Sequence, residues 1–210
     1  MPGHPDPTPA APHTDVTGLI LAGGRGARLG GADKGLLELT GRPLVQHVFE
    51  RLAPQVGTVL LSANRSHTRY RALGFAPLDD GPYPFAGPLA GLRAGLLACD
   101  TPWLLAVACD LPRLPLDVCA RLLAAAPPQD THARVPFDGT HHQYACLLLP
   151  TRALVLVESH LQSGRRSLRA LLATIGWLGV DFAADMRTQD AFANLNTPAD
   201  FDTLTCTGPP

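Results

Sequence analysis

Apolar segments of two kinds alternate along the chain. Short runs such as residues 17–22 and 103–108 are almost wholly apolar, which is typical of strands buried on both faces of a parallel sheet. Between them lie segments of helical length, such as residues 88–99. This alternation predicts a three-layer α/β fold, an open, mainly parallel sheet with helices on both faces.

The same pattern locates the individual elements. Strands are predicted at 17–22, 58–62, 76–78, 103–108, 133–136 and 144–149, with a hairpin turn at 137–140. Helices are predicted at 66–73, 88–99, 116–126, 154–163 and 167–173, after Pro43 with Leu44, Val48, Phe49 and Leu52 on one face, and after Thr197 and Pro198. No internal repeat interrupts this order.

Polar residues follow several of the predicted strands directly. A glycine-rich segment follows the first strand, Ser62 ends the second, Asp79 and Asp80 follow the third, and Asp110 follows the strand at 103–108. In an open α/β sheet, ligands bind at the carboxyl ends of the strands. We therefore expect these polar residues to meet at one edge of the sheet.

The glycine-rich segment suits an anion. Six glycines fall within the thirteen residues from Gly23 to Gly35, so the backbone can approach a ligand closely and point N–H groups at it. Lys34 is the only lysine among the 17 Lys and Arg residues of the chain. Such a lysine either survives by chance on a solvated surface or marks a place that needs a compact ammonium. With Arg28 in the same segment, the pattern favours a phosphate site.

Two familiar glycine motifs do not match this segment. A dinucleotide fingerprint G-x-G-x-x-G that starts at Gly24 would need its third glycine one residue before Gly30. A Walker loop needs Gly-Lys-Ser/Thr, whereas Lys34 follows Asp33 and precedes Gly35. The segment therefore indicates neither a Rossmann dehydrogenase nor a P-loop GTPase.

Asp110 is the strongest candidate for a metal ligand. A carboxylate at the end of an apolar strand, close to phosphate-binding backbone, is where a Mg²⁺ ligand belongs, although an Asp before Leu111 and Pro112 can also simply form a turn. Asp80 is either a ligand contact or, like Asp79, a solvated loop charge.

Three other polar features have competing interpretations. Arg165 and Arg166 after a glycine are either a solvated helix start or a clamp for a second anionic substrate. His141 and His142 fit a surface hairpin better than a metal site, because adjacent residues seldom share one metal. Cys109 is expected to pack under the site rather than act as a nucleophile.

Composition narrows the class of protein. A length of 210 residues is on the order of one domain, and we expect it at 16–205. The net charge of −1 gives no long-range attraction to nucleic acid or membranes, so anion binding must be local. Five cysteines without a C-x-x-C favour reduced thiols. Residues 1–15, rich in Pro and Ala, resemble a disordered tail rather than a signal peptide, and no apolar run is long enough for a membrane helix, so a soluble, cytoplasmic protein is expected.

A series of short motifs resembles one known family. They are Leu21-Ala22-Gly23-Gly24, Arg28-Leu29-Gly30-Gly31, Asp33-Lys34-Gly35, Gly41-Arg42-Pro43-Leu44, Ala63-Asn64-Arg65, Gly87-Pro88-Leu89-Ala90-Gly91, Cys109-Asp110-Leu111-Pro112 and Asn194-Leu195-Asn196-Thr197-Pro198. In this order, over residues 17–204, the series is similar to the molybdenum cofactor guanylyltransferases of the MobA type. The glycine-rich segment alone resembles the wider nucleotidyltransferases, whose sheet is glycosyltransferase-A-like.

The resemblance implies roles for individual residues. Guanine would be read through the backbone of Leu21, Ala22 and Gly23, with Gly24, Ser62 and Asp80 as further nucleotide contacts. Lys34 and Arg28 would hold phosphates, and Asp110 would carry Mg²⁺. Arg165, Arg166, Asn194 and Asn196 would contact the second substrate. Ser62 stands where the family often has Asn.

The implied reaction transfers GMP from GTP to the terminal phosphate of molybdopterin, with pyrophosphate as the leaving group and Mg²⁺ as cofactor. Transient contact with a cofactor-delivery protein or an acceptor molybdoenzyme would follow. Alternatives are a molybdopterin cytidylyltransferase, a sugar-phosphate nucleotidyltransferase and a non-catalytic GTP-binding module. Gly23 argues against the cytidine enzymes, which tend to have Ala-Ala-Gly here, and Asp110 argues against a pure binding module.

The isolation of Lys34 leads to a first prediction. Lys34→Arg is expected to reduce turnover nearly as much as Lys34→Ala, because a planar guanidinium cannot replace a compact ammonium in a cradle of backbone groups. Steady-state assays of both variants test this expectation. Turnover near that of the unmodified protein in the arginine variant would contradict it.

Overall fold

The middle layer of the protein is a seven-stranded sheet. The computed structural model describes residues 11–24, 32–127, 129–183, 191–195 and 200 of the chain. The sheet has the order β5-β4-β1-β6-β8-β7-β9. Its strands are β1 (His13–Leu21), β4 (Val56–Ser62), β5 (Pro77–Leu78), β6 (Trp103–Ala108), β7 (Ala133–Phe137), β8 (Cys146–Pro150) and β9 (Trp177–Asp181).

The strands of this sheet run mainly in one direction. β1 is parallel to β4 and β6, and β4 is parallel to β5, whereas β8 is antiparallel to both β6 and β7. β9 is parallel to β7, so β8 is the one described strand of the sheet that runs against the others. A separate ribbon pairs β2 (Glu38–Leu39) with β3 (Arg42–Pro43).

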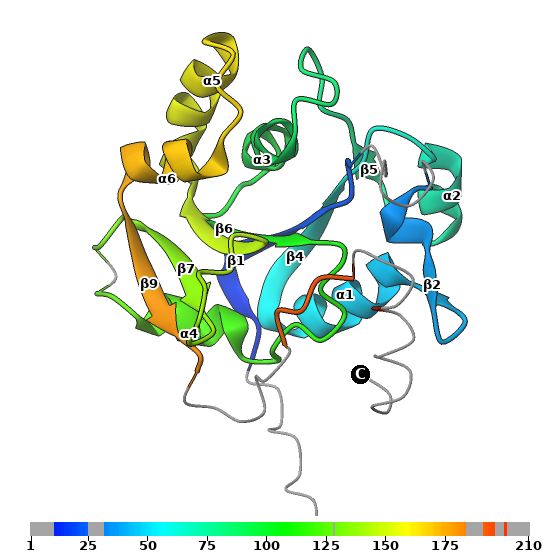
Figure 1. The fold of residues 1–210 in the computed structure, drawn as a ribbon, viewed down its shortest axis with the longest axis horizontal. Helices are drawn as coiled ribbons and strands as arrows, with labels where there is room; N and C mark the ends of the chain where they lie inside the picture. Colours follow the sequence, from blue (N-terminus) through cyan, green and yellow to red (C-terminus); the bar gives the residue numbers. More distant parts are fainter. Residues whose placement is uncertain (1–10, 25–31, 128, 184–190, 196–199, 201–210) are drawn as a thin grey trace, which may run out of the picture.

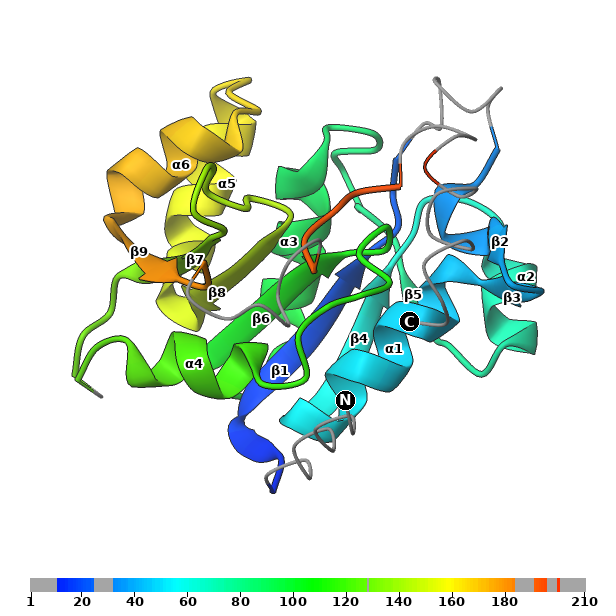
Figure 2. The same cartoon turned by 60° about the horizontal axis from the view of Figure 1, so that its bottom comes forward.

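Helices cover both faces of the sheet, which confirms the predicted three-layer α/β fold (Figures 1 and 2). The helices are α1 (Leu44–Leu52), α2 (His67–Ala72), α3 (Pro88–Leu97), α4 (Val118–Ala124), α5 (Leu154–Gln162) and α6 (Leu168–Ile175). Short 3₁₀ turns are η2 (Lys34–Leu36), η3 (Ala53–Gln55) and η4 (Thr151–Ala153). α3, α5 and α6 lie on one face of the sheet, and α1 and α4 lie on the other (Figure 2).

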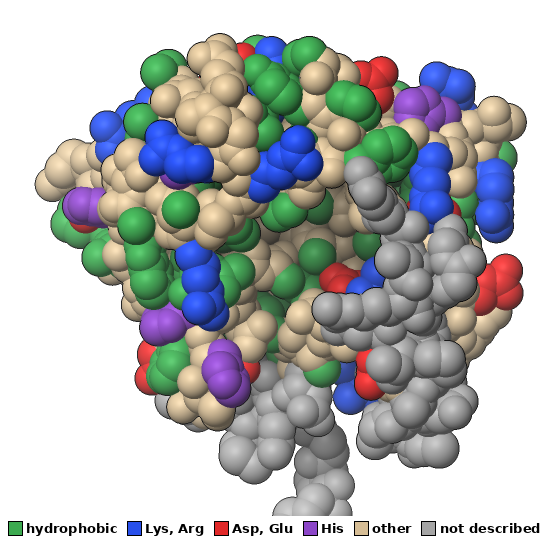
Figure 3. All heavy atoms as spheres, turned by 45° about the horizontal axis from the view of Figure 1, so that its top comes forward, with side chains coloured by type: hydrophobic (Ala, Val, Ile, Leu, Met, Phe, Trp, Pro, Cys, Tyr) green, Lys and Arg blue, Asp and Glu red, His purple; other side chains and the backbone are tan. Residues whose placement is uncertain are grey.

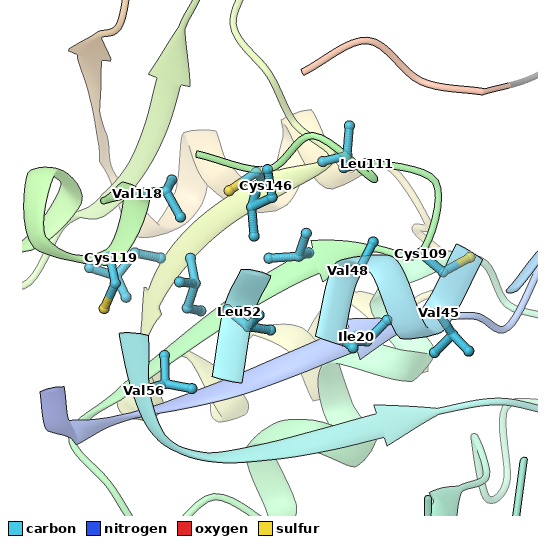
Figure 4. Packing of buried hydrophobic residues seen from close by; sticks show 14 of the residues in the cluster. Ile20, Val45, Val48, Leu52, Val56, Cys109, Leu111, Val118, Cys119 and Cys146 are labelled. Carbon is cyan, nitrogen blue, oxygen red and sulfur yellow. The ribbon is translucent and has the colours of Figure 1, made fainter. Parts of the chain in front are cut away.

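Alternate residues of the central strands supply two hydrophobic cores. In β6, Leu105 and Val107 belong to the core under α1 and α4, whereas Leu104 and Ala106 belong to the core under α3, α5 and α6. Figure 4 shows Ile20 of β1 among side chains of α1 in the first core. Burial on both faces explains why 103–108 is apolar without interruption and why this strand is predicted correctly at both ends.

The start of the first strand differs from the prediction. β1 begins at His13, which pairs with Val56, so the boundary predicted at residue 15 for the tail lies inside the strand. Thr14 and Asp15 are exposed, and they belong to the strand through their backbone alone. Polar side chains at an exposed strand end give no apolar pattern. Residues 1–10 lie outside the described residues.

Other predicted elements need smaller corrections. Phe49, predicted on the buried face of α1, is 37% exposed and makes an edge contact with Phe75, while Val45 takes a place in the core. β9 was not predicted, because half-exposed residues and Gly179 weaken its pattern. The helix predicted after Thr197 falls mostly on residues outside the described part of the chain. Among the described residues, no helix is both long enough and apolar enough to span a bilayer.

Candidate functional site

A cavity opens at the edge of the sheet where the parallel strands end. Its volume is about 420 Å³, and Figure 3 shows a hollow in this face of the molecule. The walls come from the ends of β1, β4 and β6, from α3, and from residues at the start of β8 and α6. The lining residues are Leu21, Gly23, Gly24, Ser62, Asp80, Gly87, Pro88, Gly91, Leu92, Ala108, Tyr144, Ala145, Leu147 and Leu168.

Helix α3 reaches this cavity through a glycine. A Cβ on Gly91 would lie 2.7 Å from Leu21 Cδ2 and 2.8 Å from Ser62 Oγ, so α3 can pack this closely on β1 and β4 only without a side chain at that position. The close packing brings the amino end of α3 to the cavity wall.

Asp80 is held in the cavity wall by an amide and a hydroxyl. Asn64 donates from Nδ2 to Asp80 Oδ2 at 2.5 Å, and the Asp80 backbone N–H donates to Asn64 Oδ1 at 3.1 Å. Ser62 Oγ donates to the other carboxylate oxygen at 3.5 Å. Asn64 Nδ2 also lies 3.4 Å from the Gly23 carbonyl oxygen, which it can reach as a donor. These bonds tie the segments after β1, β4 and β5 together.

The environment of Asp80 favours its protonated form. Burial raises the pKa of this carboxyl above its ordinary value, and the negative charge of Asp79 adds to the rise. Hydrogen bonds from Asn64, from the Phe85 backbone and from Ser62 act in the opposite direction. A ligand that brings N–H donors to Asp80 would therefore stabilise a carboxylate that the protein alone leaves partly desolvated.

A second carboxylate lies in an ion pair. Lys34 Nζ lies 2.5 Å from Asp110 Oδ2 and joins η2 to the segment that follows β6. Asp110 is 8% exposed, and its Oδ1 is buried without a hydrogen-bond partner among the described residues. Leu195 N donates to the Asp110 carbonyl oxygen at 3.3 Å, which brings Asn194 close to the pair. Asn194 Oδ1 is likewise buried without a partner in the part of the chain that the structure describes.

These oxygens fit a hard divalent cation bound mainly by a ligand. Among the described residues, no group of three or more His, Cys, Asp or Glu side chains forms a complete metal cage. Mg²⁺ commonly takes one or two protein carboxylates and completes its shell with substrate phosphates and water. Asp110, through Oδ1, can supply the one protein carboxylate that such a site needs.

Comparison with known proteins identifies the family. Residues 18–178 match the model of the MobA-like NTP transferase domain. A curated protein of Bordetella petrii, named molybdenum cofactor guanylyltransferase, is 42% identical over 197 residues, which cover 91% of this chain and 97% of the relative. The chain belongs to the molybdenum cofactor guanylyltransferase family. The resemblance in its motifs is thereby confirmed.

Solved structures of this fold include other nucleotidyltransferases. Molybdopterin-guanine dinucleotide biosynthesis protein A of Archaeoglobus fulgidus superposes with a TM-score of 0.74 at 20% identity, covering 91% of this chain and 98% of that one. A 4-diphosphocytidyl-2C-methyl-D-erythritol synthase of Anaerococcus prevotii superposes with a TM-score of 0.69 at 10% identity, covering 90% of this chain and 94% of that one. At these identities the likeness concerns the fold alone.

The site brings together most of the nucleotide residues predicted from the sequence. Leu21, Gly23, Gly24, Ser62 and Asp80 line the cavity. Lys34 and Asp110 pair at the same edge of the sheet.

Ala22 does not line the cavity. It is buried in the core, its N–H donates to the Ser62 carbonyl oxygen at 2.8 Å, and the neighbouring Leu21 carbonyl accepts from Cys109 N at 3.1 Å. These two backbone groups are therefore engaged within the protein.

The residues predicted for the second substrate are placed in part. Arg165 and Arg166 are exposed on the connection between α5 and α6, one turn before Leu168 of the cavity wall, and Arg165 Nε donates to Ser163 Oγ at 3.0 Å. Asn196, also predicted for the second substrate, and Arg28, predicted for the nucleotide phosphates, lie outside the described residues.

Cys109 and His142 lie in the surroundings predicted for them. Cys109 is buried, and burial raises its pKa, so it packs beneath the site as a thiol. His142 packs against Phe137 and Trp177 in the hairpin region.

The reasoning from the sequence missed the role of Asn64 and the cavity residue Tyr144. Asn64 was expected at this edge, after the second predicted strand, but without a role; the structure shows that it holds Asp80. Tyr144 lines the cavity from the start of β8, with the Arg169 guanidinium 4.9 Å from the centre of its ring. Because β8 is antiparallel, its amino end reaches the edge where the other strands end, and a rule based on carboxyl ends overlooks it.

The raised pKa of Asp80 leads to a second prediction. Below its unfolded-state pKa, the group is protonated in both states and costs nothing. As the pH rises through the folded-state pKa, the ionised carboxylate lowers stability, and this loss persists at neutral pH. Asp80→Asn is therefore expected to melt at or above the temperature of the unmodified protein at pH 7.5, with the difference shrinking toward pH 4.

The exposed neighbour Asp79 supplies the control for this experiment. Asp79→Asn removes a charge of the same sign from the same loop, and we expect a smaller shift with less pH dependence. Thermal unfolding of both variants across the pH range is the measurement. A melting temperature of Asp80→Asn below that of the unmodified protein at pH 7.5, with no pH dependence of the difference, would contradict the account.

Proposed function

We propose that this protein transfers GMP from GTP to the terminal phosphate of molybdopterin and releases pyrophosphate. The observation that carries the proposal is the Lys34–Asp110 pair beside a cavity at the strand ends, with one carboxylate oxygen left for a further partner. The name of the Bordetella petrii relative at 42% identity supports the choice of reaction.

The cavity fits the base of the nucleotide. Guanine carries two adjacent donors, N1–H and the N2 amino group, which match the two oxygens of a carboxylate such as Asp80. Asn64 holds that carboxylate in place. The Leu21 carbonyl and the Ala22 N–H are already bonded within the protein, so backbone recognition of the base falls to Gly23 and Gly24, which line the cavity.

The Lys34–Asp110 pair fits the phosphates. Lys34 would leave Asp110 for the nucleotide phosphates and neutralise the charge that develops on the leaving pyrophosphate. Asp110, through Oδ1, would hold Mg²⁺, whose positive charge would offset the charge of the phosphates. Nucleotidyltransferases of this kind generally use a divalent metal, and the sparse protein ligands favour Mg²⁺.

The protein need not supply a nucleophile. A phosphate monoester has a second pKa of about 6, so the acceptor phosphate is mostly dianionic at neutral pH. The work of the protein is then to hold two polyanions in line and to offset their repulsion. Asn194, next to the ion pair, and the exposed Arg165 and Arg166 are the candidates for holding the acceptor.

A third prediction separates an enzyme from a nucleotide-binding module. Asp110→Asn keeps the shape of the side chain but removes a negative ligand, so we expect pyrophosphate release with GTP and molybdopterin to fall about 10²-fold or more. GTP should still bind, more weakly and with less dependence on Mg²⁺, because the cavity around Asp80 is intact. Pyrophosphate assays and isothermal titration calorimetry give the two readouts.

Asp100→Asn is the matched control, because Asp100 is an exposed carboxylate before the opposite end of the same strand, β6. Its pyrophosphate release should stay within twofold of the unmodified protein. If pyrophosphate release by Asp110→Asn also stays within twofold of the unmodified protein, Asp110 only forms a turn and does not bind the metal.

Nucleotide binding distinguishes the alternative functions. A larger thermal shift of the unmodified protein with CTP than with GTP would indicate a cytidylyltransferase. GTP binding without any pyrophosphate release would indicate a non-catalytic binding module.

A further inference from the structure

One hydroxyl group contacts both neighbours of Lys34. Tyr70 of α2 is fully buried, and its hydroxyl donates to Asp33 Oδ1 at 2.7 Å. A Cβ on Gly35 would lie 2.5 Å from the Tyr70 hydroxyl oxygen. The Tyr70 hydroxyl therefore contacts the chain immediately before and immediately after the single lysine.

Asp33 is engaged by the protein rather than directed at a ligand. It is 9% exposed, and its Oδ2 forms an ion pair with Arg65, whose Nε lies 3.7 Å away. Arg65 Nη2 also donates to the Ala32 carbonyl oxygen at 2.6 Å. Residues 32 and 33 are thus both held by the Arg65 side chain, from the segment between β4 and α2.

The turn that carries Lys34 is closed by its own backbone and also packs against β1. Leu36 N donates to the Asp33 carbonyl oxygen at 3.0 Å and closes η2. A Cβ on Gly35 would lie 3.3 Å from the Ala22 side chain, so the turn lies against the end of β1 as well as against α2. Burial raises the pKa of the Tyr70 hydroxyl, which therefore stays protonated and donates at neutral pH.

We propose that Tyr70 and Asp33 are positioning residues that fix the backbone of Lys34, so that its ammonium reaches the phosphate and metal site. Lysine has a long side chain with several rotatable bonds, and its terminal charge is placed accurately only if its backbone is fixed. The expected effect on turnover rests on the proposed function, since that function assigns Lys34 to the phosphates. The expected effect on the position of the Lys34 side chain does not depend on it.

The single lysine allows a direct test without any nucleotide. Protein grown with ¹³Cε-labelled lysine gives one side-chain signal, that of Lys34. Tyr70→Phe keeps the buried ring and removes only the hydroxyl. We expect its Lys34 signal to move toward the position found in Asp110→Asn, in which the ion pair is lost, and kcat to fall about tenfold through misplacement of the ammonium.

Thr17→Val is the matched control for loss of a buried hydroxyl. Thr17 is 1% exposed, and its hydroxyl bonds to Thr101 Oγ1 at 2.8 Å, away from η2. We expect a comparable fall in melting temperature, an unchanged Lys34 signal and turnover within twofold of the unmodified protein. A merely structural role of Tyr70 would give the same result in both variants and would overturn the proposal.

Gly35→Ala provides an independent test by suppression. Its new methyl group would collide with the Tyr70 hydroxyl, so we expect turnover to fall about tenfold or more. In the double variant with Tyr70→Phe, the nearest remaining contacts are 3.3 Å and 3.5 Å, and turnover should exceed the product of the two single effects. Strictly multiplicative losses would contradict the proposed contact.

The two proposals can fail separately. If the unmodified protein does not release pyrophosphate from GTP, the proposed function fails, while the Lys34 signal still reports whether Tyr70 positions the lysine. If the unmodified protein is active but Tyr70→Phe leaves the Lys34 signal unchanged, the positioning role fails and the proposed function stands.

Discussion

The ion pair between Lys34 and Asp110 is the interaction on which the site depends. It exists because β1 and β6 are neighbours in register, with Leu21 opposite Ala108, so the segments that follow the two strands meet at one edge. A buried ion pair is expensive unless its remaining polar atoms are satisfied. Asp110 Oδ1 has no partner among the described residues, which makes this end of the sheet suited to a cation or a hydrogen-bond donor brought by a ligand.

The site contains two carboxylates in different environments. Asp110 faces an ammonium and has one oxygen without a hydrogen-bond partner among the described residues, whereas Asp80 faces an amide and a hydroxyl in surroundings that raise its pKa. The first environment suits a polyphosphate, and the second suits the N–H groups of a base. One nucleotide extended along the strand ends would satisfy both, which is why the site favours a nucleoside triphosphate over a simple phosphate.

Much of this arrangement can be predicted from the sequence, for physical reasons that also set the limit. The strand at 103–108 is buried on both faces and is correct at both ends, and Asp110 after it lies at the expected edge. Tyr144 could not be placed, because its position follows from the reversed direction of β8, which no local pattern encodes. Tyr70 looks like an ordinary core residue of α2, and its bond to Asp33 spans 37 residues.

The most direct test of the account is Mn²⁺ binding, followed by electron paramagnetic resonance, with and without a GTP analogue carrying a non-hydrolysable α,β-methylene bridge. Because Lys34 pairs with Asp110 Oδ2 and few other ligands among the described residues surround the site, we predict weak Mn²⁺ binding to the protein alone. Mn²⁺ should bind to the complex with the analogue more tightly than to the protein alone and more tightly than to the free analogue, and Asp110→Asn should reduce the affinity of the complex to that of the free analogue. Equal Mn²⁺ affinity of the complex and the free analogue, or an unchanged affinity of the complex in Asp110→Asn, would contradict a metal-binding role of Asp110.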